Sequence, residues 1–245
     1  MDAPAWLSQQ RADVPPGDQW LGETERRVLA RLQVAPRRAA WRLGRWTAKA
    51  ALAARLGVPP SAVEVLAAAD GAPEAWLGGA RLPVSLSLSH RGDRSIAVIA
   101  DAPSVVGCDL ELIEPRSGAF VGEWLAVPEQ RLISGCDEAR QALIANLIWT
   151  AKEAAAKVRR EGLRLDVRTA AVTFAEGRAE AGGWRPVQVD WGDGATATAG
   201  WWRGEPGWVM TIAAAPAPTA PHVLIPSVTP PPAPSAVLEP ARRAP

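Results

Sequence analysis

The stretch Val-Val-Gly-Cys-Asp-Leu-Glu-Leu at residues 105–112 places the strongest constraint on how this chain can fold. Its β-branched and apolar residues alternate with a period of two, which predicts a β-strand. Because alternate side chains of a strand share a face, Asp109 and Glu111 stand side by side, and Cys108, Leu110 and Leu112 are expected to point into a core. With no internal cation evident between them, the two carboxylates suit a hard cation, above all Mg²⁺. The alternative is a solvated strand face, because Asp-x-Glu often arises by chance.

A second alternating stretch, residues 84–90, has apolar residues at every other position and serines between them. A turn at 91–93 and a returning strand at 95–100 predict a β-hairpin. The strand with the two carboxylates follows closely, so we expect a three-stranded meander that brings Ser89 and His90 near those carboxylates. A small hydroxyl and an imidazole at a strand end suit contact with phosphate. They are equally compatible with an ordinary hairpin end.

Two helices are predicted ahead of these strands, at residues 23–34 and 37–56, and the second ends at Gly57. Basic and aromatic side chains recur along the second helix at spacings of three and four, and therefore share one stripe. Its members are Arg38, Trp41, Arg42, Arg45 and Lys49. This stripe is either a solvated basic face or a surface that faces a phosphorylated ligand.

A third long helix is predicted at residues 137–161, closed by Gly162. One of its faces is apolar and is predicted to pack inward. Polar and aromatic residues on another face recur at spacings of three and four: Asn146, Trp149, Glu153 and Lys157. Glu153 and Lys157 form either part of a site or a surface ion pair, which is worth about 0.3 kcal/mol.

The order of the predicted elements indicates an α+β fold. Further strands are predicted at residues 62–67, 168–174, 185–191, 196–203 and 207–213, and short helices at 121–126 and 128–134. We divide the chain into an irregular segment at 1–22, an N-terminal half at 23–112, a C-terminal half at 113–213 and a Pro/Ala-rich disordered tail at 214–245. Each half is predicted to run from helices into a β-meander. Two similar halves in a pseudo-twofold arrangement, with the site at their interface, are therefore expected.

The composition excludes several classes of protein. A net charge of +1 provides no global field for nucleic acid or an acidic membrane, so any polyanion site must be local. Two cysteines form no disulfide framework, and we expect reduced thiols in a cytosol. The N-terminus lacks the pattern of a signal peptide, and no stretch reaches membrane-spanning length. We therefore expect a cytoplasmic monomer without membrane or nucleic-acid partners.

Three motifs occur in a fixed order: Ser-Leu-Ser-His at 87–90, Gly-Cys-Asp-Leu-Glu at 107–111 and Trp-Thr-Ala-Lys-Glu-Ala-Ala-Ala-Lys at 149–157. In this combination the chain resembles the Sfp-type 4'-phosphopantetheinyl transferases. The signature of that family is a Ser-His element, a Gly-x-Asp-x-Glu strand and Trp-x-x-Lys-Glu-x-x-x-Lys on a helix. The stretch at 44–49 also resembles the family's N-terminal basic helix, and the resemblance covers roughly residues 20–213.

The resemblance implies an enzyme that transfers 4'-phosphopantetheine from coenzyme A to a serine of an acyl or peptidyl carrier protein. Adenosine 3',5'-bisphosphate is the other product, Mg²⁺ is the cofactor, and coenzyme A is the co-substrate. The implied metal ligands are Asp109, Glu111 and Glu153. The residues implied to bind coenzyme A are Ser89, His90, Asp109, Lys157 and, at the 3'-phosphate end, Arg27, Arg45 and Lys49. Ala72 is a departure, because many members carry a basic residue before the proline of this Gly-x-Pro turn, so one contact to coenzyme A is missing or supplied from elsewhere.

The implied chemistry agrees with the residues present. The attacking serine belongs to the carrier protein, so this chain needs no nucleophile, and it has no Gly-x-Ser-x-Gly motif. It needs a base near the incoming hydroxyl, for which Glu153 is the first candidate and Glu111, acting through a water, the second. Lys157 is expected to approach the diphosphate. Two other functions remain open: a catalytically degenerate homologue that binds carrier protein or coenzyme A, and a Mg²⁺-dependent phosphohydrolase.

Overall fold

The structure, a computed structural model, describes residues 3–161 and 166–225. Its helices are α1 (Glu23–Arg31), α2 (Ala35–Leu56), α3 (Gly118–Trp124), α4 (Val127–Ser134) and α5 (Glu138–Arg159), with short 3-10 turns η1 (Arg11–Asp13), η2 (Pro60–Ala62) and η4 (Ala181–Gly183). Its strands are β1 (Ala5–Gln10), β2 (Val63–Ala67), β3 (Pro73–Leu77), β4 (Ala80–Arg81), β5 (Val84–Arg91), β6 (Arg94–Asp101), β7 (Val105–Leu112), β8 (Ala171–Phe174), β9 (Arg185–Asp190), β10 (Thr198–Glu205), β11 (Trp208–Ala215) and β12 (His222–Val223).

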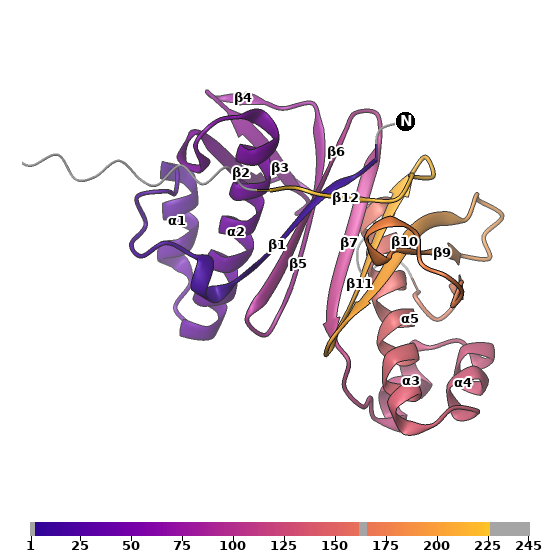
Figure 1. Cartoon of the computed structure of the whole chain (residues 1–245). Helices are drawn as coiled ribbons and strands as arrows, with labels where there is room; N and C mark the ends of the chain where they lie inside the picture. The colour runs from indigo at the N-terminus through magenta and orange to yellow at the C-terminus, as the bar shows by residue number, and fades with distance from the viewer. Residues whose placement is uncertain (1–2, 162–165, 226–245) are drawn as a thin grey trace, which may run out of the picture.

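Two β-sheets pack face to face at the centre of the molecule (Figure 1). Helix α2 covers the outer face of the first sheet, and α5 covers the outer face of the second. Apolar side chains from both inner faces form the core between the sheets, including Trp6, Val98, Cys108 and Ile212. The predicted α+β class is confirmed, and the pseudo-twofold relation between the halves stays a prediction.

The first sheet has the strand order β12-β1-β6-β5. Strand β1 comes from the segment predicted to be irregular, so that prediction is wrong for residues 5–10. Trp6 lies in the core between the sheets, and the next residue, Leu7, packs beneath α2, as alternation along a strand requires. The strand is short and ends in the polar residues Gln9 and Gln10, and this conceals its period in the sequence.

The hairpin of β5 and β6 is confirmed, but the predicted three-stranded meander is wrong. Strand β7 instead pairs with β11 at the edge of the second sheet, whose order is β7-β11-β10-β9-β8. The strand with the two carboxylates therefore belongs to the C-terminal half, and the predicted boundary at residue 112 lies one strand too late. Alternation defines the two faces of a strand but does not specify its partner.

Strand β7 lies alongside β5, although in the described part of the chain these two strands form no backbone ladder. The backbone N–H groups of Val106 and Cys108 each donate to a β5 serine hydroxyl, Ser85 Oγ and Ser87 Oγ respectively, at 3.0 Å. Because a buried N–H without a partner is costly, the alternating serines stabilise the free edge of β7. We call the contact between β5 and β7 the seam.

The remaining predicted elements occur with small shifts of their ends. Strands β8 to β11 form the predicted second meander, and residues 62–67 contain β2. The sequence did not predict β3 and β4, which pair with β2 in a three-stranded sheet. Helix α5 ends at Arg159, and the predicted terminator Gly162 lies outside the described residues. None of the described helices is long and apolar enough to cross a membrane.

The predicted disordered tail is wrong for residues 214–225. Strand β11 runs to Ala215, and β12 pairs in parallel with β1. Leu224 donates its backbone N–H to the carbonyl of Trp6 at 2.7 Å. Proline-rich composition indicates disorder, but the outer edge of β1 offers hydrogen bonds to an extended segment that reaches it. Residues 226–245 lie outside the described residues.

Candidate functional site

Asp109 of β7 is the centre of the candidate site. Its Oδ1 accepts hydrogen bonds from Ser89 Oγ of β5 at 2.7 Å and from Lys157 Nζ of α5 at 3.0 Å. The side chain is buried, and its Oδ2 has no hydrogen-bond partner among the described residues. An ionised carboxylate has several acceptor positions, so Oδ2 retains the capacity to bind a donor or a cation.

Lys157 joins the two strands of the seam through its ammonium group. Its Nζ donates to the carbonyl of Cys108 on β7 at 2.7 Å and to the carbonyl of Leu88 on β5 at 3.4 Å. Burial is the largest single contribution and lowers the pKa of Lys157, but the contributions of Asp109, Cys108 and Glu153 together outweigh it and raise this pKa. Since 33% of the side chain stays exposed, Lys157 is a fixed positive charge with one side open to a ligand.

Glu111, two residues further along β7, is paired with arginines. Its Oε2 lies 3.0 Å from Nη2 of Arg116 and 3.3 Å from Nε of Arg91. Burial and then repulsion from Asp109 raise the pKa of Glu111, whereas the two arginines lower it in part. The inference that no internal cation lies near the two carboxylates is therefore wrong. Lys157 neutralises Asp109, and the arginines neutralise Glu111.

Neither arginine was predicted to belong to the site. Arg91 is the last residue of β5 and directly follows the Ser-His motif, so its position at the hairpin was a usable signal. Arg116 lies in the irregular segment between β7 and α3, where no periodicity predicts the direction of a side chain. The guanidinium of Arg116 lies 4.7 Å from the ring centroid of Phe120, and its Nε donates to Asn146 Oδ1 at 2.7 Å.

Glu153 lies one helical turn before Lys157 on α5 and is half-buried. Within the described residues its carboxylate has no hydrogen bond or ion pair. Burial and then the negative charge of Asp109 raise the pKa of Glu153, and Lys157 opposes the rise. Glu111 also raises this pKa, so the three carboxylates share one electrostatic environment. A carboxylate with these properties is suited to accept a proton.

The structure brings the Ser-His motif to the same place. Ser89 bonds Asp109 directly, and His90 is close enough to Lys157 for the ammonium charge to affect its titration. Shielding from water and then the charge of Lys157 lower the pKa of His90, which favours the neutral imidazole. On the other side, a Cβ placed on Gly44 of α2 would lie 3.8 Å from the His90 ring.

Gly107 determines how closely α5 approaches β7. A Cβ at this position would lie 1.9 Å from the carbonyl oxygen of Ala154 and 3.0 Å from the backbone nitrogen of Val158. Real atoms do not approach so closely, so only glycine allows the helix backbone to contact the strand here. This contact places Lys157 within hydrogen-bonding distance of the strand that carries Asp109. It gives a physical reason for the glycine of the Gly-x-Asp-x-Glu motif.

Two of the residues implied for the 3'-phosphate end make internal contacts. Lys49 is fully buried and donates to Glu25 Oε2 at 2.7 Å. Arg45 donates to the carbonyl of Val65 and lies 3.8 Å from Glu25 Oε1, with 13% of its side chain exposed. Burial lowers the pKa of both basic groups, and Glu25 opposes the fall. The structure does not bring these two residues to the seam.

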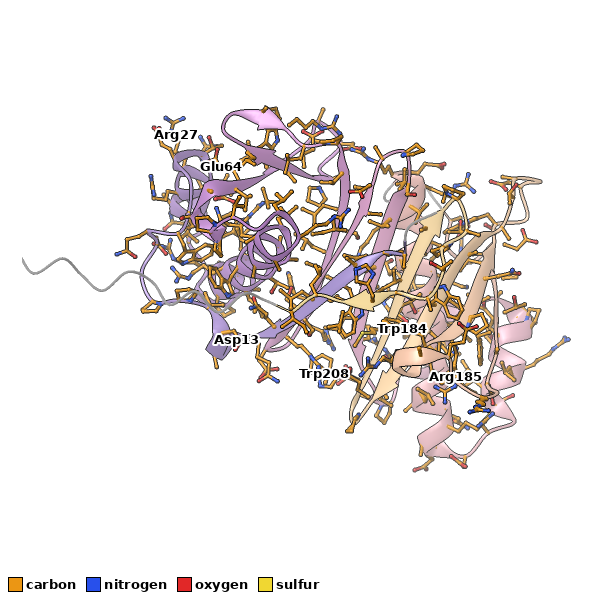
Figure 2. The ribbon with its side chains drawn as sticks, turned by 45° about the horizontal axis from the view of Figure 1, so that its top comes forward. Asp13, Arg27, Glu64, Trp184, Arg185 and Trp208 are labelled. Atoms are coloured by element: carbon orange, nitrogen blue, oxygen red, sulfur yellow. The ribbon has the colours of Figure 1, made fainter. Side chains whose placement is uncertain are left out.

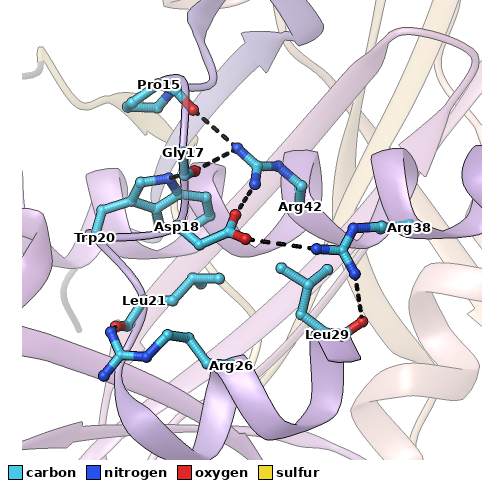
Figure 3. A network of polar contacts seen from close by, with 9 residues as sticks. All are labelled: Pro15, Gly17, Asp18, Trp20, Leu21, Arg26, Leu29, Arg38 and Arg42. Atoms are coloured by element: carbon cyan, nitrogen blue, oxygen red, sulfur yellow. Dashed lines mark hydrogen bonds and ion pairs between the residues drawn. The ribbon is translucent and has the colours of Figure 1, made fainter. Parts of the chain in front are cut away.

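The other basic residues of the first helices also have local partners. Arg27 projects from the outer side of α1, where it pairs with Glu23 (Figure 2). Arg38 and Arg42 both pair with Asp18, and Arg42 also bonds two carbonyls of the same loop (Figure 3). Arg38 and Arg42 of the predicted stripe therefore hold the loop ahead of α1 against α2. Arg45 and Lys49 of the same stripe instead bind Glu25 of α1.

The three carboxylates have the chemistry of a hard-cation site but no preformed geometry for one. All candidate donors are oxygens, Asp109 Oδ2 is buried without a partner, and repulsion contributes to the raised pKa of Glu111 and Glu153. A bound cation would reverse that repulsion. However, no three His, Cys, Asp or Glu side chains in the described ranges are already arranged to hold a metal ion. Glu111 is the least available donor because two arginines bind it.

A protein-family comparison agrees with this geometry. The family model for the 4'-phosphopantetheinyl transferase superfamily, ACPS, matches residues 105–199, from the first residue of β7 to the second of β10. The chain carries a 4'-phosphopantetheinyl transferase superfamily domain. The matched region contains all three candidate carboxylates and Lys157, whereas Ser89 and His90 precede it. The match to this superfamily over residues 105–199 supports a transferase activity. No curated protein sequence matches the chain.

Proposed function

We propose that this protein is an Sfp-type 4'-phosphopantetheinyl transferase that modifies a serine of an acyl or peptidyl carrier protein, with coenzyme A as donor and Mg²⁺ as cofactor. The observation that carries the proposal is the meeting of Ser89, Asp109 and Lys157 at one point of the seam. These residues come from β5, β7 and α5, which are separated in sequence, and the superfamily match covers the last two elements.

Binding of coenzyme A follows from the charge and hydrogen-bonding capacity of the seam. The diphosphate is a polyanion, and Lys157 offers a fixed ammonium group that is partly exposed. Ser89 and His90 add a hydroxyl and an imidazole beside it. We do not assign a binding role to Lys49, which is fully buried, or to Arg27, which lies on the outer side of α1.

The transfer step is a displacement at phosphorus, and Glu153 supplies the base. Its carboxylate accepts the proton of the carrier serine, whose oxygen then bonds to the phosphorus that carries pantetheine. The bond from that phosphorus to the bridging oxygen breaks, and adenosine 3',5'-bisphosphate leaves with the electron pair. The raised pKa of Glu153, caused first by burial, makes it a better proton acceptor than an exposed glutamate. Mg²⁺, held by Asp109, Glu111 and Glu153, would offset the negative charge of the diphosphate.

The direct test is mass spectrometry of carrier proteins incubated with this protein, coenzyme A and Mg²⁺. A panel of fatty-acid, polyketide and peptide-synthetase carriers should include at least one that gains a single phosphopantetheine. Lys157→Ala should lose most of the transfer. Arg168→Ala is the matched control, because it removes one positive charge from an exposed ion pair with Asp166. Both variants should show the melting temperature of the wild-type protein to within a few degrees.

The same assay separates the competing functions. Coenzyme A binding without modification of any carrier would identify a degenerate homologue and refute the proposed transfer. Release of phosphate or a nucleotide without carrier protein would identify a phosphohydrolase. Equal transfer by Lys157→Ala and wild type would show that the chemistry does not take place at the seam.

A further inference from the structure

The residue that ends α5 has an unusual backbone conformation. Arg160 is the C-cap, with φ 57° and ψ 24°, and it is the only non-glycine residue with positive φ in the described ranges. Helix α2 has the same length of 22 residues and ends in the same conformation at Gly57, with φ 68° and ψ 31°. Glycine adopts this left-handed conformation without steric cost because it has no Cβ, so the backbone of an arginine here is strained. Strain of this kind often accompanies a functional constraint.

The guanidinium of Arg160 makes a two-pronged contact with the other half of the molecule. Its Nε donates to Asp70 Oδ2 and its Nη2 to Asp70 Oδ1, each at 2.8 Å. Asp70 belongs to the turn between β2 and β3. The side chains are 41% and 36% exposed, and an ion pair that exposed contributes little to stability. The stability gained from this ion pair is therefore a weak explanation for the strained backbone of Arg160.

The position of Arg160 along α5 connects it to the candidate site. Glu153, Lys157 and Arg160 follow one another at spacings of four and three, and both Lys157 and Arg160 reach across to the N-terminal half, to Leu88 and Asp70 respectively. Arg160 lies about 4.5 Å further along the helix axis than Lys157. Its neighbour Arg159 instead pairs with Glu161 and Asp193. Asp70 thus binds a half-exposed guanidinium that follows Lys157 by three residues. Asp70 lies in the same turn as Ala72, the position at which the basic residue is missing.

We propose that Arg160 is a phosphate-binding residue for coenzyme A at this site, an inference that rests on the proposed function. A guanidinium presents parallel N–H donors that match phosphate oxygens, and without ligand the Asp70 carboxylate occupies two of these donors. Lys157 and Arg160 then contact different parts of one polyanion. Coenzyme A offers two phosphate groups to this residue, the 3'-phosphate and the diphosphate.

The test is calorimetric binding of coenzyme A and of dephospho-coenzyme A, which lacks only the 3'-phosphate, to the full chain with Mg²⁺ present. Arg160→Gly is the variant of choice, because glycine keeps the left-handed C-cap and removes only the guanidinium. It should weaken coenzyme A binding by about tenfold or more, the usual effect of a charge-assisted phosphate contact. Arg159→Ala is the matched control, because it removes the same charge from the adjacent residue, and its affinity should be unchanged.

The two ligands identify the phosphate. A loss confined to coenzyme A assigns Arg160 to the 3'-phosphate, and an equal loss with both ligands assigns it to the diphosphate. Asp70→Asn distinguishes ligand binding from a structural role. It should retain affinity because the guanidinium remains and loses a competing carboxylate.

An Asp70→Asn variant as weak as Arg160→Gly would make the pair purely structural and overturn the inference. So would an Arg160→Gly variant that binds both ligands normally. If the wild-type protein binds coenzyme A but transfers nothing to any carrier, the proposed function fails while the binding role of Arg160 is still decided by these affinities. If the wild type binds neither ligand, both proposals fail.

Discussion

The substitution Gly107→Ala tests how the packing of α5 on β7 produces the site. The added methyl would meet the backbone carbonyl of Ala154, which belongs to a regular helix and cannot move aside like a flexible side chain. The whole helix must therefore shift relative to the strand. The residues that face the seam from α5, Glu153 and Lys157, would move with it.

The structure sets the size of the effect. An ordinary contact for a Cβ begins at 3.4 Å, and a Cβ at Gly107 would lie 1.9 Å from the carbonyl oxygen of Ala154, so the strand and helix must separate by about 1.5 Å. A shift of that size lengthens the 3.0 Å contact between Lys157 and Asp109 to about 4.5 Å, beyond hydrogen-bonding range. Misplacement by about 1 Å costs roughly 100-fold in rate. Overpacking should cost about 2 kcal/mol in the free energy of unfolding and lower the melting temperature by about 4–8 °C.

The measurements are the transfer rate and the melting temperature of the purified variant. Gly200→Ala is the matched control, because its methyl would lie 2.5 Å from the carbonyl oxygen of Ile212, on the neighbouring strand rather than on α5. It should be destabilised to a similar degree while retaining most of its transfer rate below the melting temperature. A Gly107→Ala protein with wild-type rate and stability would refute the reasoning. A rate loss equal to that of Gly200→Ala would show that only general stability matters.

Three further predictions concern charge, metal and chain length. Burial and then Asp109 raise the folded-state pKa of Glu153, so its contribution to stability is present at acid pH and is lost as pH rises through that pKa. Glu153→Gln should therefore raise the melting temperature of the metal-free protein at neutral pH but not at acid pH. Its transfer rate should fall on the order of 100-fold. A variant with the same melting temperature as wild type at both pH values would contradict the stability prediction. EDTA should abolish transfer and Mg²⁺ should restore it, and full activity in chelator would remove the metal assignment. Truncation after residue 215 should lower the free energy of unfolding by about 3 kcal/mol relative to truncation after residue 225, because it removes three hydrogen bonds that residues 216–225 make to the sheets. Equal thermal unfolding curves for the two truncated proteins would show that this segment contributes nothing to stability.

The regular elements could be predicted because their signals are local. The period of two in 105–112 correctly placed Cys108 and Leu110 in the core, although Leu112 at the end of the strand is only half-buried. Helical spacing correctly predicted α2 and α5. Strand pairing was harder to predict from the sequence, because it depends on segments that are far apart along the chain. The serines of β5 illustrate the limit: their alternation predicted a strand face, but not that Ser85 and Ser87 satisfy the edge of β7.

The basic residues show the same limit for the site. Lys49 and Lys157 both lie on long helices, in stripes spaced by three and four. The first is buried against Glu25 from α1, and the second is partly exposed beside Asp109 from β7. Which partner a lysine receives depends on tertiary packing, and helical spacing carries no information about it. Arg160 could not be predicted for another reason, because it occupies a left-handed C-cap, where the sequence pattern of a helix end calls for glycine.

A comparison within the chain separates the scaffold from the chemistry. Trp-Thr-Ala-Lys occurs at 46–49 on α2 and again at 149–152 on α5. Each lysine is buried and donates at 2.7 Å to a glutamate in the first turn of a shorter helix, Glu25 or Glu129. Each glutamate also accepts a backbone N–H at 3.0 Å from a strand, that of Val65 or Val172.

The positions that follow the two lysines differ. On α5 the next residue is Glu153 and the fifth is Lys157, whereas both corresponding residues on α2 are alanines. The buried lysine–glutamate pair also occurs on α2, where no carboxylate follows the lysine, so the pair is not tied to the candidate site. We therefore interpret Lys152 of the Trp-x-x-Lys-Glu motif as a residue that packs α5 onto α4. Breaking such a pair by removing one partner costs about 3–5 kcal/mol. Lys152→Ala should therefore lower the melting temperature and lose activity only through unfolding, whereas Lys157→Ala should lose transfer while remaining folded.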